Sequence, residues 1–158
     1  MKTPMNVFNT AMKKKNKNRK GFSLVELIVC LVIMAILAAA LVPTLIGYIN
    51  QTKQSNAKNE AATAVNAVQT IASSAWADPA GEYHNNSGGS NITITYTDGT
   101  YSFSDADIAV VKALAEVKGT ISGVTVKNGV VDTLTYADQK GTTTIYYYDA
   151  KYNTTAKS

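Results

Sequence analysis

Cysteine and histidine are almost absent from this 158-residue chain, which contains one of each, Cys30 and His84. A single cysteine excludes an internal disulfide framework and a cysteine-based zinc site. His84 lies in a stretch rich in asparagine and glycine, with no nearby nucleophile or metal-ligand spacing, and we interpret it as a solvated loop side chain. The sequence also contains no glycine-rich phosphate-binding loop. We therefore expect no enzyme activity, no metal site and no cofactor.

Acidic residues are missing from residues 1–21, which hold seven lysines and arginines. Residues 22–158 hold eight basic and eleven acidic side chains, so the formal charge of +4 divides into +7 and −3. Basic charge confined to one end does not make a nucleic-acid-binding surface on a folded domain, and we predict no direct nucleic-acid partner. We expect the basic block to face the cytoplasmic side of a membrane.

A long apolar run follows the basic block, because residues 22–49 contain only one charged side chain, Glu26. As a helix this run would extend roughly 42 Å, compared with a hydrocarbon core of about 30 Å. The run predicts a precursor anchored in the inner (cytoplasmic) membrane with its C-terminal domain outside. Two other interpretations stay open, an uncleaved signal anchor and a secretory signal peptide cut near residues 38–40. The carboxylate inside the run and the apolar residues beyond Ala40 argue against the signal peptide.

The junction between the basic block and the apolar run has the pattern K-G-F-S-L-V-E-L at residues 20–27. With the apolar run and Pro43 behind it, this pattern closely resembles the N-terminus of type IV prepilins, over roughly residues 13–60. The resemblance implies that a membrane-embedded prepilin peptidase cuts between Gly21 and Phe22 and methylates the new N-terminus. It also implies assembly roles for Glu26, which would pair with the Phe22 terminus of a neighbouring subunit, and for Pro43, which would kink or loosen the helix.

The resemblance implies three regions: a removed leader at residues 1–21, a transmembrane and filament-core half-helix at 22–49, and an extracellular head at 50–158. It implies a structural subunit of a type IV pilus at the cell surface, with the adhesion and twitching motility of such fibres. The implied partners are other pilin subunits, the prepilin peptidase, the membrane platform of the assembly machine and, before assembly, membrane lipid. Two alternatives stay open, a pseudopilin of a type II secretion or DNA-uptake (competence) apparatus, and a surface-anchored carbohydrate-binding adhesin.

The chain departs from many pilins in two respects. The leader of 21 residues is long for a mature chain that begins with Phe22, and translation from Met12 instead of Met1 would shorten it to ten residues. The chain also lacks a C-terminal cysteine pair, an absence more typical of Gram-positive relatives. Strand pairing alone would then hold the C-terminal segment.

Small apolar residues at steps of three and four extend the helix beyond the apolar run, from about residue 22 to residue 76. The alternation and turn signals that follow predict, in chain order, a loop at 77–90, a hairpin of 92–96 with 101–103, a helix at 105–118 capped by Ser104, and meander strands at 121–126, 130–136 and 142–148. We therefore expect an α+β fold in which the long N-terminal helix packs on an antiparallel sheet of four or five strands. Pilins have the same architecture.

Tyrosines crowd the last predicted strand, where Tyr146, Tyr147 and Tyr148 are consecutive. Strand alternation places Tyr147 on one face and the other two on the opposite face. One set would pack on the helix, and the exposed set would contact other subunits or stack on sugars. We take the three tyrosines as candidate surface contacts and favour sheet packing and subunit contacts over a dedicated glycan site.

Overall fold

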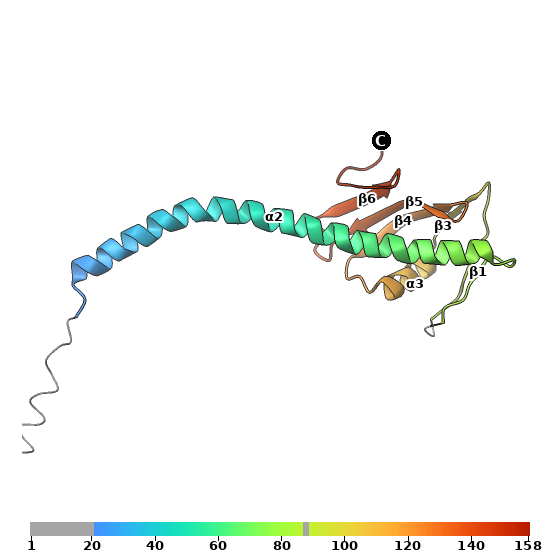
Figure 1. Ribbon diagram of the computed structural model, residues 1–158, viewed down its shortest axis with the longest axis horizontal. Helices are drawn as coiled ribbons and strands as arrows, with labels where there is room; N and C mark the ends of the chain where they lie inside the picture. The colour runs from blue at the N-terminus through green and yellow to red at the C-terminus, as the bar shows by residue number, and fades with distance from the viewer. Residues whose placement is uncertain (1–20, 87–88) are drawn as a thin grey trace, which may run out of the picture. The chain divides into compact units, whose positions relative to one another are not determined.

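The computed structural model describes residues 21–86 and 89–158, which divide into two compact units, one ending at Ile46 and the other running from Gly47 to Ser158. Helix α2 (Leu24–Ala77) contributes to both units (Figure 1). Its ends lie within two residues of the predicted ones, so the prediction of one long helix is confirmed. Of the leader predicted at residues 1–21, all but Gly21 lies outside the described residues.

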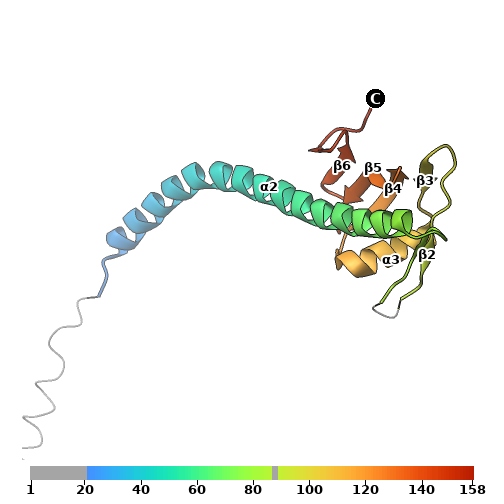
Figure 2. The same ribbon diagram turned by 45° about the vertical axis from the view of Figure 1, so that its right-hand side comes forward.

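In the second unit, α2 buries one face against a five-stranded sheet, as Figures 1 and 2 show from two directions. The buried residues on this face are Ala57, Ala61, Ala64, Val65, Ala67, Val68, Ile71, Ala72 and Ala75. They recur at the three- and four-residue steps of one helix face. Because most of them are alanine or valine, the helix axis can lie close to the sheet, and the buried core of the second unit forms between the two.

The principal sheet is antiparallel, with the strand order β3-β4-β5-β6-β7. Its strands are β3 (Thr100–Ser102), β4 (Thr120–Lys127), β5 (Val130–Ala137), β6 (Thr144–Tyr148) and β7 (Lys151–Asn153). Asn128 and Gly129 join β4 to β5 with φ of 49° and 78°, as a two-residue type I′ turn requires. The α+β fold and the predicted meander are therefore confirmed, and β7 adds a strand that the sequence analysis did not predict.

The predicted hairpin of residues 92–96 with residues 101–103 is wrong. Strand β2 (Ile92–Thr93) pairs instead with β1 (Glu82–Tyr83) in a separate two-stranded sheet, and β3 pairs with β4. The loop predicted at residues 77–90 is also wrong in part, because it contains β1.

The alternation of residues 92–96 reflects packing into the core rather than pairing with β3. The side chains of Ile92 and Ile94 are 1% and 3% exposed. Gly81 has φ +70° and accepts a 2.8 Å hydrogen bond from the Ile94 N–H, which brings the chain before β1 beside β2. Among the described residues, the pairing next to the predicted turn is limited to an isolated bridge between Thr97 and Thr100, which flank Asp98 and Gly99.

Helix α3 (Asp105–Ala115) begins with a capping box. The Ser104 hydroxyl accepts from the Asp107 N–H at 3.3 Å, and the Asp107 carboxylate accepts from the Ser104 N–H at 2.8 Å. The predicted cap is confirmed, and it accounts for the acidic first turn. The helix ends before the predicted residue 118 because Glu116 adopts the left-handed conformation, with φ 53°.

Two polar side chains of α2 bind the sheet, and the first is Gln69. Its amide Nε2 donates to the carbonyl of Gly129 at 2.8 Å, and its Oε1 accepts from the Val131 N–H at 3.1 Å. One side chain thus satisfies a donor and an acceptor at the β4–β5 turn. Gln69 therefore fixes the register of this hairpin against the helix.

The second is Glu60, whose carboxylate accepts a short hydrogen bond from the Tyr136 hydroxyl. That hydroxyl also accepts from the Gly119 N–H at 3.1 Å, and Glu60 accepts from the Lys118 N–H at 3.4 Å. Tyr136 is 1% exposed. Burial, followed by the hydrogen bond to Glu60, raises the pKa of the Tyr136 phenol above its usual 10.0, so it stays a donor.

Candidate functional site

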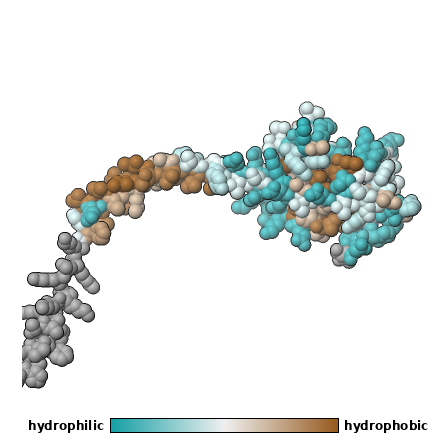
Figure 3. Space-filling model, viewed as in Figure 1, coloured by the Kyte–Doolittle hydropathy of each residue, from teal (hydrophilic) through white to brown (hydrophobic). Residues whose placement is uncertain are grey.

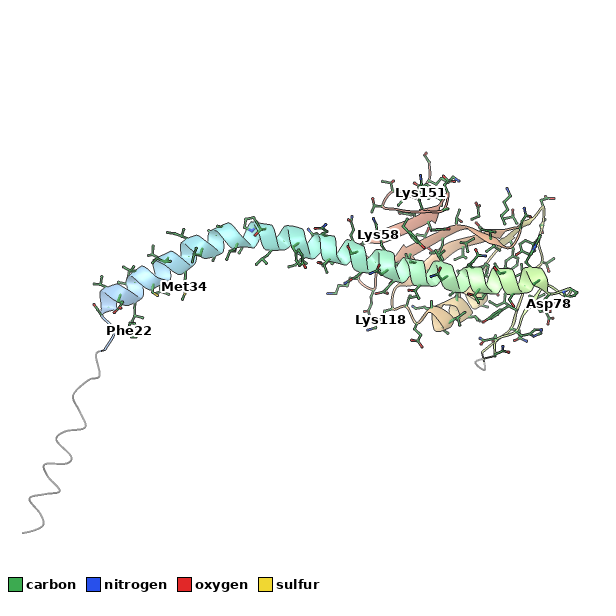
Figure 4. All side chains as sticks on the ribbon, viewed as in Figure 1. Phe22, Met34, Lys58, Asp78, Lys118 and Lys151 are labelled. Atoms are coloured by element: carbon green, nitrogen blue, oxygen red, sulfur yellow. The ribbon has the colours of Figure 1, made fainter. Side chains whose placement is uncertain are left out.

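The part of α2 that precedes the head exposes all of its large apolar side chains. From Phe22 to Ile49 these side chains are at least half exposed, from 50% at Ile49 to 77% at Phe22. Figure 3 shows the apolar surface along this part of α2, and Figure 4 labels Phe22 and Met34 on it. Contiguous apolar surface on soluble monomers rarely exceeds a few hundred Å². By length and composition α2 can cross a membrane, so lipid or other helices are the natural cover for this surface.

Gly21, Phe22 and Ser23 precede the helix and have no regular secondary structure. The Leu27 N–H donates to the Ser23 carbonyl at 3.2 Å, and this bond marks the first helical turn. No atom lies within 4 Å of the position that a Gly21 Cβ would occupy. The peptide bond between Gly21 and Phe22 is therefore exposed and lies outside the helix. A protease that binds its substrate as an extended chain could reach this bond without unfolding the helix.

Glu26 lies in the first turn of α2 and is exposed. An acid at this position interacts favourably with the helix macrodipole, by about 0.3–1 kcal/mol. Within the described part of the chain, Glu26 makes no ion pair; the ion pairs there join His84 with Glu82 and Lys157 with Asp149. Its carboxylate therefore remains available to a cation from outside the described residues.

Pro43 is accommodated inside α2, which continues on both sides of it. Proline has no N–H, so the helix lacks one hydrogen bond to the carbonyl of Ala39. Close by, the Thr44 hydroxyl donates to the Leu41 carbonyl at 2.7 Å. Gly47 follows, with open space around its Cα. A loosened turn at Pro43 stays a prediction.

The three consecutive tyrosines do not form one surface. Tyr147 packs against the core beside Tyr152, with ring centroids 5.1 Å apart. Tyr146 lies on the opposite face, and the Tyr148 hydroxyl donates to the Thr155 carbonyl at 3.3 Å. The alternation predicted from the sequence therefore leaves Tyr146 and Tyr148 as the candidate contacts.

Residues 16–42 match the family model of the prokaryotic N-terminal methylation motif, the signature of type IV prepilins. The N-terminal region therefore carries the leader signature of a type IV pilin-like precursor. Gly21, Phe22 and Glu26 lie inside the matched range of the prepilin, and Pro43 lies one residue beyond it. Comparisons with curated proteins and with solved structures gave no significant match. The head of this prepilin is therefore interpreted from its own residues.

One feature of the prepilin head was missed in the sequence analysis. Trp76, there treated only as the end of the long helix, is 55% exposed in the second unit. It is the single tryptophan of the chain and stands two residues before the Asp78-Pro79 helix breaker. The sequence did contain a signal for this feature, because Trp76 is an aromatic residue in the last turn of an otherwise alanine-rich helix.

Proposed function

We propose that this prepilin is a structural subunit of a type IV pilus. The peptidase cuts after Gly21 and methylates Phe22, and the mature subunit polymerises through residues 22–49. The observation that carries the proposal is the apolar helix segment within and just after the methylation motif, whose large side chains are all at least half exposed. Such a surface needs lipid before assembly and neighbouring helices after it, which is the sequence of environments that a pilin passes through.

Glu26 supplies the specificity of this assembly. A carboxylate in the bilayer costs up to about 3 kcal/mol at the centre, and the helix macrodipole offsets about 0.3–1 kcal/mol of it. Cleavage after Gly21 creates an α-ammonium on Phe22, and N-methylation keeps this charge. A neighbouring subunit in the right register brings this cation to Glu26, so both charges are satisfied when the helix leaves the lipid.

The proposed partners follow from these steps. They are the prepilin peptidase, membrane lipid, the membrane platform of the assembly machine and further pilin subunits. The precursor lies in the cytoplasmic membrane with the basic block inside and the head outside, because seven lysines and arginines precede the apolar run and only Lys53 and Lys58 follow it closely. The role is structural rather than enzymatic.

A pseudopilin of a type II secretion or DNA-uptake apparatus would use the same N-terminal chemistry. An anchored adhesin would use the helix only as a membrane span. The three roles differ in where the processed chain is found. A pilus subunit is released in long fibres when cells are sheared, a pseudopilin stays in the cell envelope, and an anchored adhesin keeps its leader.

The test is mass spectrometry of the N-terminal peptide from protein sheared off intact cells. We expect N-methylated Phe22. A terminus at Leu41 would show a cleaved signal peptide, and an intact leader found only in membranes would show an anchor; either result contradicts the proposal. Gly21→Leu is expected to abolish cleavage, because the peptidase cleft then meets a bulky side chain. Gly47→Leu is the matched control, since both glycines have open space around them, and it should be cut normally.

Glu26→Gln separates processing from assembly. We expect this variant to be cleaved and methylated as usual but to lower the yield of sheared fibres at least tenfold, because breaking one side of an interfacial ion pair costs about 2–5 kcal/mol. Normal fibre yield from Glu26→Gln would contradict the pairing of Glu26 with the Phe22 terminus.

A further inference from the structure

Trp76 lies in the last turn of α2 and is 55% exposed, yet its indole is held in one orientation. The Tyr96 ring meets it edge-on, with centroids 5.0 Å apart and an interplanar angle of 88°. The backbone of Gly129 lies against the indole so closely that a Cβ at residue 129 would come within 2.8 Å of Trp76 Cγ. Trp76 is therefore fixed by its neighbours although more than half of the residue is exposed, so a ligand could bind it without rearrangement of the side chain.

A pocket of about 320 Å³ opens beside the indole. Its lining includes Trp76 and Asp78, the turn that follows at residues 79–81, and residues 94–96. The volume lies at the lower end of the roughly 300–1,000 Å³ range of small-molecule sites. The pocket therefore suits one ring of a larger ligand, stacked on the indole.

The same pocket is lined by a hydrogen-bonded turn at residues 78–81. The Asp78 Oδ1 accepts from the Ala80 N–H at 2.7 Å, and the Asp78 carbonyl accepts from the Gly81 N–H at 3.0 Å. The Ile94 N–H then donates to the Gly81 carbonyl at 2.8 Å, which ties the turn to the strand region. A ligand would meet a wall that is already ordered, so little conformational entropy is lost on binding.

Asp78, labelled at the end of α2 in Figure 4, is the only charged side chain in the described lining. Its Oδ1 accepts from the turn, and its Oδ2 accepts no hydrogen bond from any described residue. A carboxylate disfavours phosphate and other anionic ligands, and it forms charge-assisted hydrogen bonds with hydroxyl donors. A pyranose has an apolar C–H face, which can stack on the indole, and a rim of hydroxyls, which can donate hydrogen bonds to the Asp78 carboxylate.

We infer that Trp76, Asp78 and the turn at residues 78–81 form a subsite for one sugar ring of a neutral oligosaccharide. The site uses neither the Gly21 cleavage nor the Glu26 pairing, so it is independent of the proposed assembly. In a fibre the site would recur on every subunit, and a weak single contact would gain affinity through multivalency.

Because Trp76 is the single tryptophan, its fluorescence reports on this site alone. The experiment uses the full precursor in a detergent without a sugar headgroup, titrated separately with cellohexaose, chitohexaose and maltohexaose. We expect at least one of them to shift the emission in a saturable manner and to protect Trp76 from quenching by acrylamide. No change with any of the three would overturn the inference.

Asp78→Asn tests the acceptor, and we expect affinity about fivefold weaker, since a neutral acceptor replaces a charged one. Asp132→Asn is the matched control, an exposed acid on β5 outside the pocket, and should bind as the wild type does. Loss of binding in Tyr146→Ala with normal binding in Asp78→Asn would overturn the assignment and place the sugar on the tyrosine face.

Two further outcomes count against the inference. An emission shift that depends on protein concentration without sugar would show that a second copy covers Trp76. A shift with tetramethylammonium but with no oligosaccharide would show a cation site. All readouts come from the uncleaved precursor, so their failure leaves the pilus proposal intact, and an unexpected N-terminus leaves this site untouched.

Discussion

The buried hydroxyl of Tyr136 offers the sharpest test of how the head is held on its helix. Tyr136→Phe removes one oxygen and keeps the ring, so it changes hydrogen bonding without opening a cavity. The hydroxyl donates to the Glu60 carboxylate and accepts from the Gly119 N–H at 3.1 Å. A hydrogen bond to a charged group contributes about 1.5–3 kcal/mol, and the buried Gly119 N–H loses its partner as well. Part of this loss is offset, because burying a phenylalanine ring on folding does not require removing water from a hydroxyl group.

We expect Tyr136→Phe to lower the free energy of unfolding by about 2 kcal/mol at neutral pH. For a domain of roughly 110 residues this corresponds to a fall in Tm of about 8 °C. The assay is thermal and urea unfolding of the fragment Gly47–Ser158, which contains the whole buried core. Tyr148→Phe is the matched control, because its hydroxyl donates to the exposed Thr155 carbonyl at 3.3 Å, and we expect a change within about 0.5 kcal/mol.

The pH dependence supplies an independent check on Tyr136. Its pKa is raised in the folded state, so the stability that its protonated form contributes is fully present below pH 10.0 and is lost as the pH rises above this value. The difference between wild type and Tyr136→Phe should therefore narrow in alkali. A loss in Tyr136→Phe no larger than that in Tyr148→Phe, or a difference that widens above pH 10.0, would refute the reasoning.

Two further predictions concern the same domain. Gln69→Ala should lower the free energy of unfolding by about 1–3 kcal/mol and remove the hydrogen-exchange protection of the Val131 amide, because Gln69 hydrogen-bonds to Gly129 and Val131. Gln51→Ala is the control, since Gln51 is an exposed glutamine on the same helix. Equal protection of the Val131 amide in both variants would show that the Gln69 hydrogen bonds are dispensable. Burial, followed by the hydrogen bond to Asp107, raises the pKa of Tyr101 to about 12, so the stability that this tyrosine contributes is present below pH 10.0 and is lost towards pH 12. In an ultraviolet titration of the tyrosines, Tyr101→Phe should lack one ionisation near pH 12 that the wild type shows. If the ionisation missing from the variant lies near pH 10 instead, the contact with Asp107 is contradicted.

The long helix was predictable because its signal is local and repeated many times. Its apolar run and the alanine and valine stripe after it both follow the helix period, so no distant contact was needed to find α2. The Ser104 cap was predictable for the same reason, since its partner Asp107 stands three residues away. The strands of the meander were found with small errors at their ends.

The errors have two causes: pairing between segments that no local signal links, and a turn that the sequence does not mark. Ile92 and Ile94 alternate like half of a hairpin, yet they are buried in the core, and β2 pairs backwards with β1. Strand β7 was missed because Asp149 and Ala150 form its turn with φ of 50° and 56°. Non-glycine residues rarely adopt this conformation, so the sequence carries no turn signal there.

The sequence by itself determined the N-terminal third of this protein: the basic block, the methylation motif, the apolar run and the single carboxylate of that run, Glu26. These features depend on local chemistry and on the cost of transferring side chains into a membrane, and both follow from residue composition alone. Only the tertiary structure decided which polar groups of the helix meet the sheet, with Glu60 at Tyr136 and Gln69 at the β4–β5 turn. It also decided that Tyr96 and Gly129 pack against Trp76, which stays 55% exposed in the pocket that Asp78 also lines. These contacts join residues far apart in the chain, and their register depends on packing that no local pattern specifies.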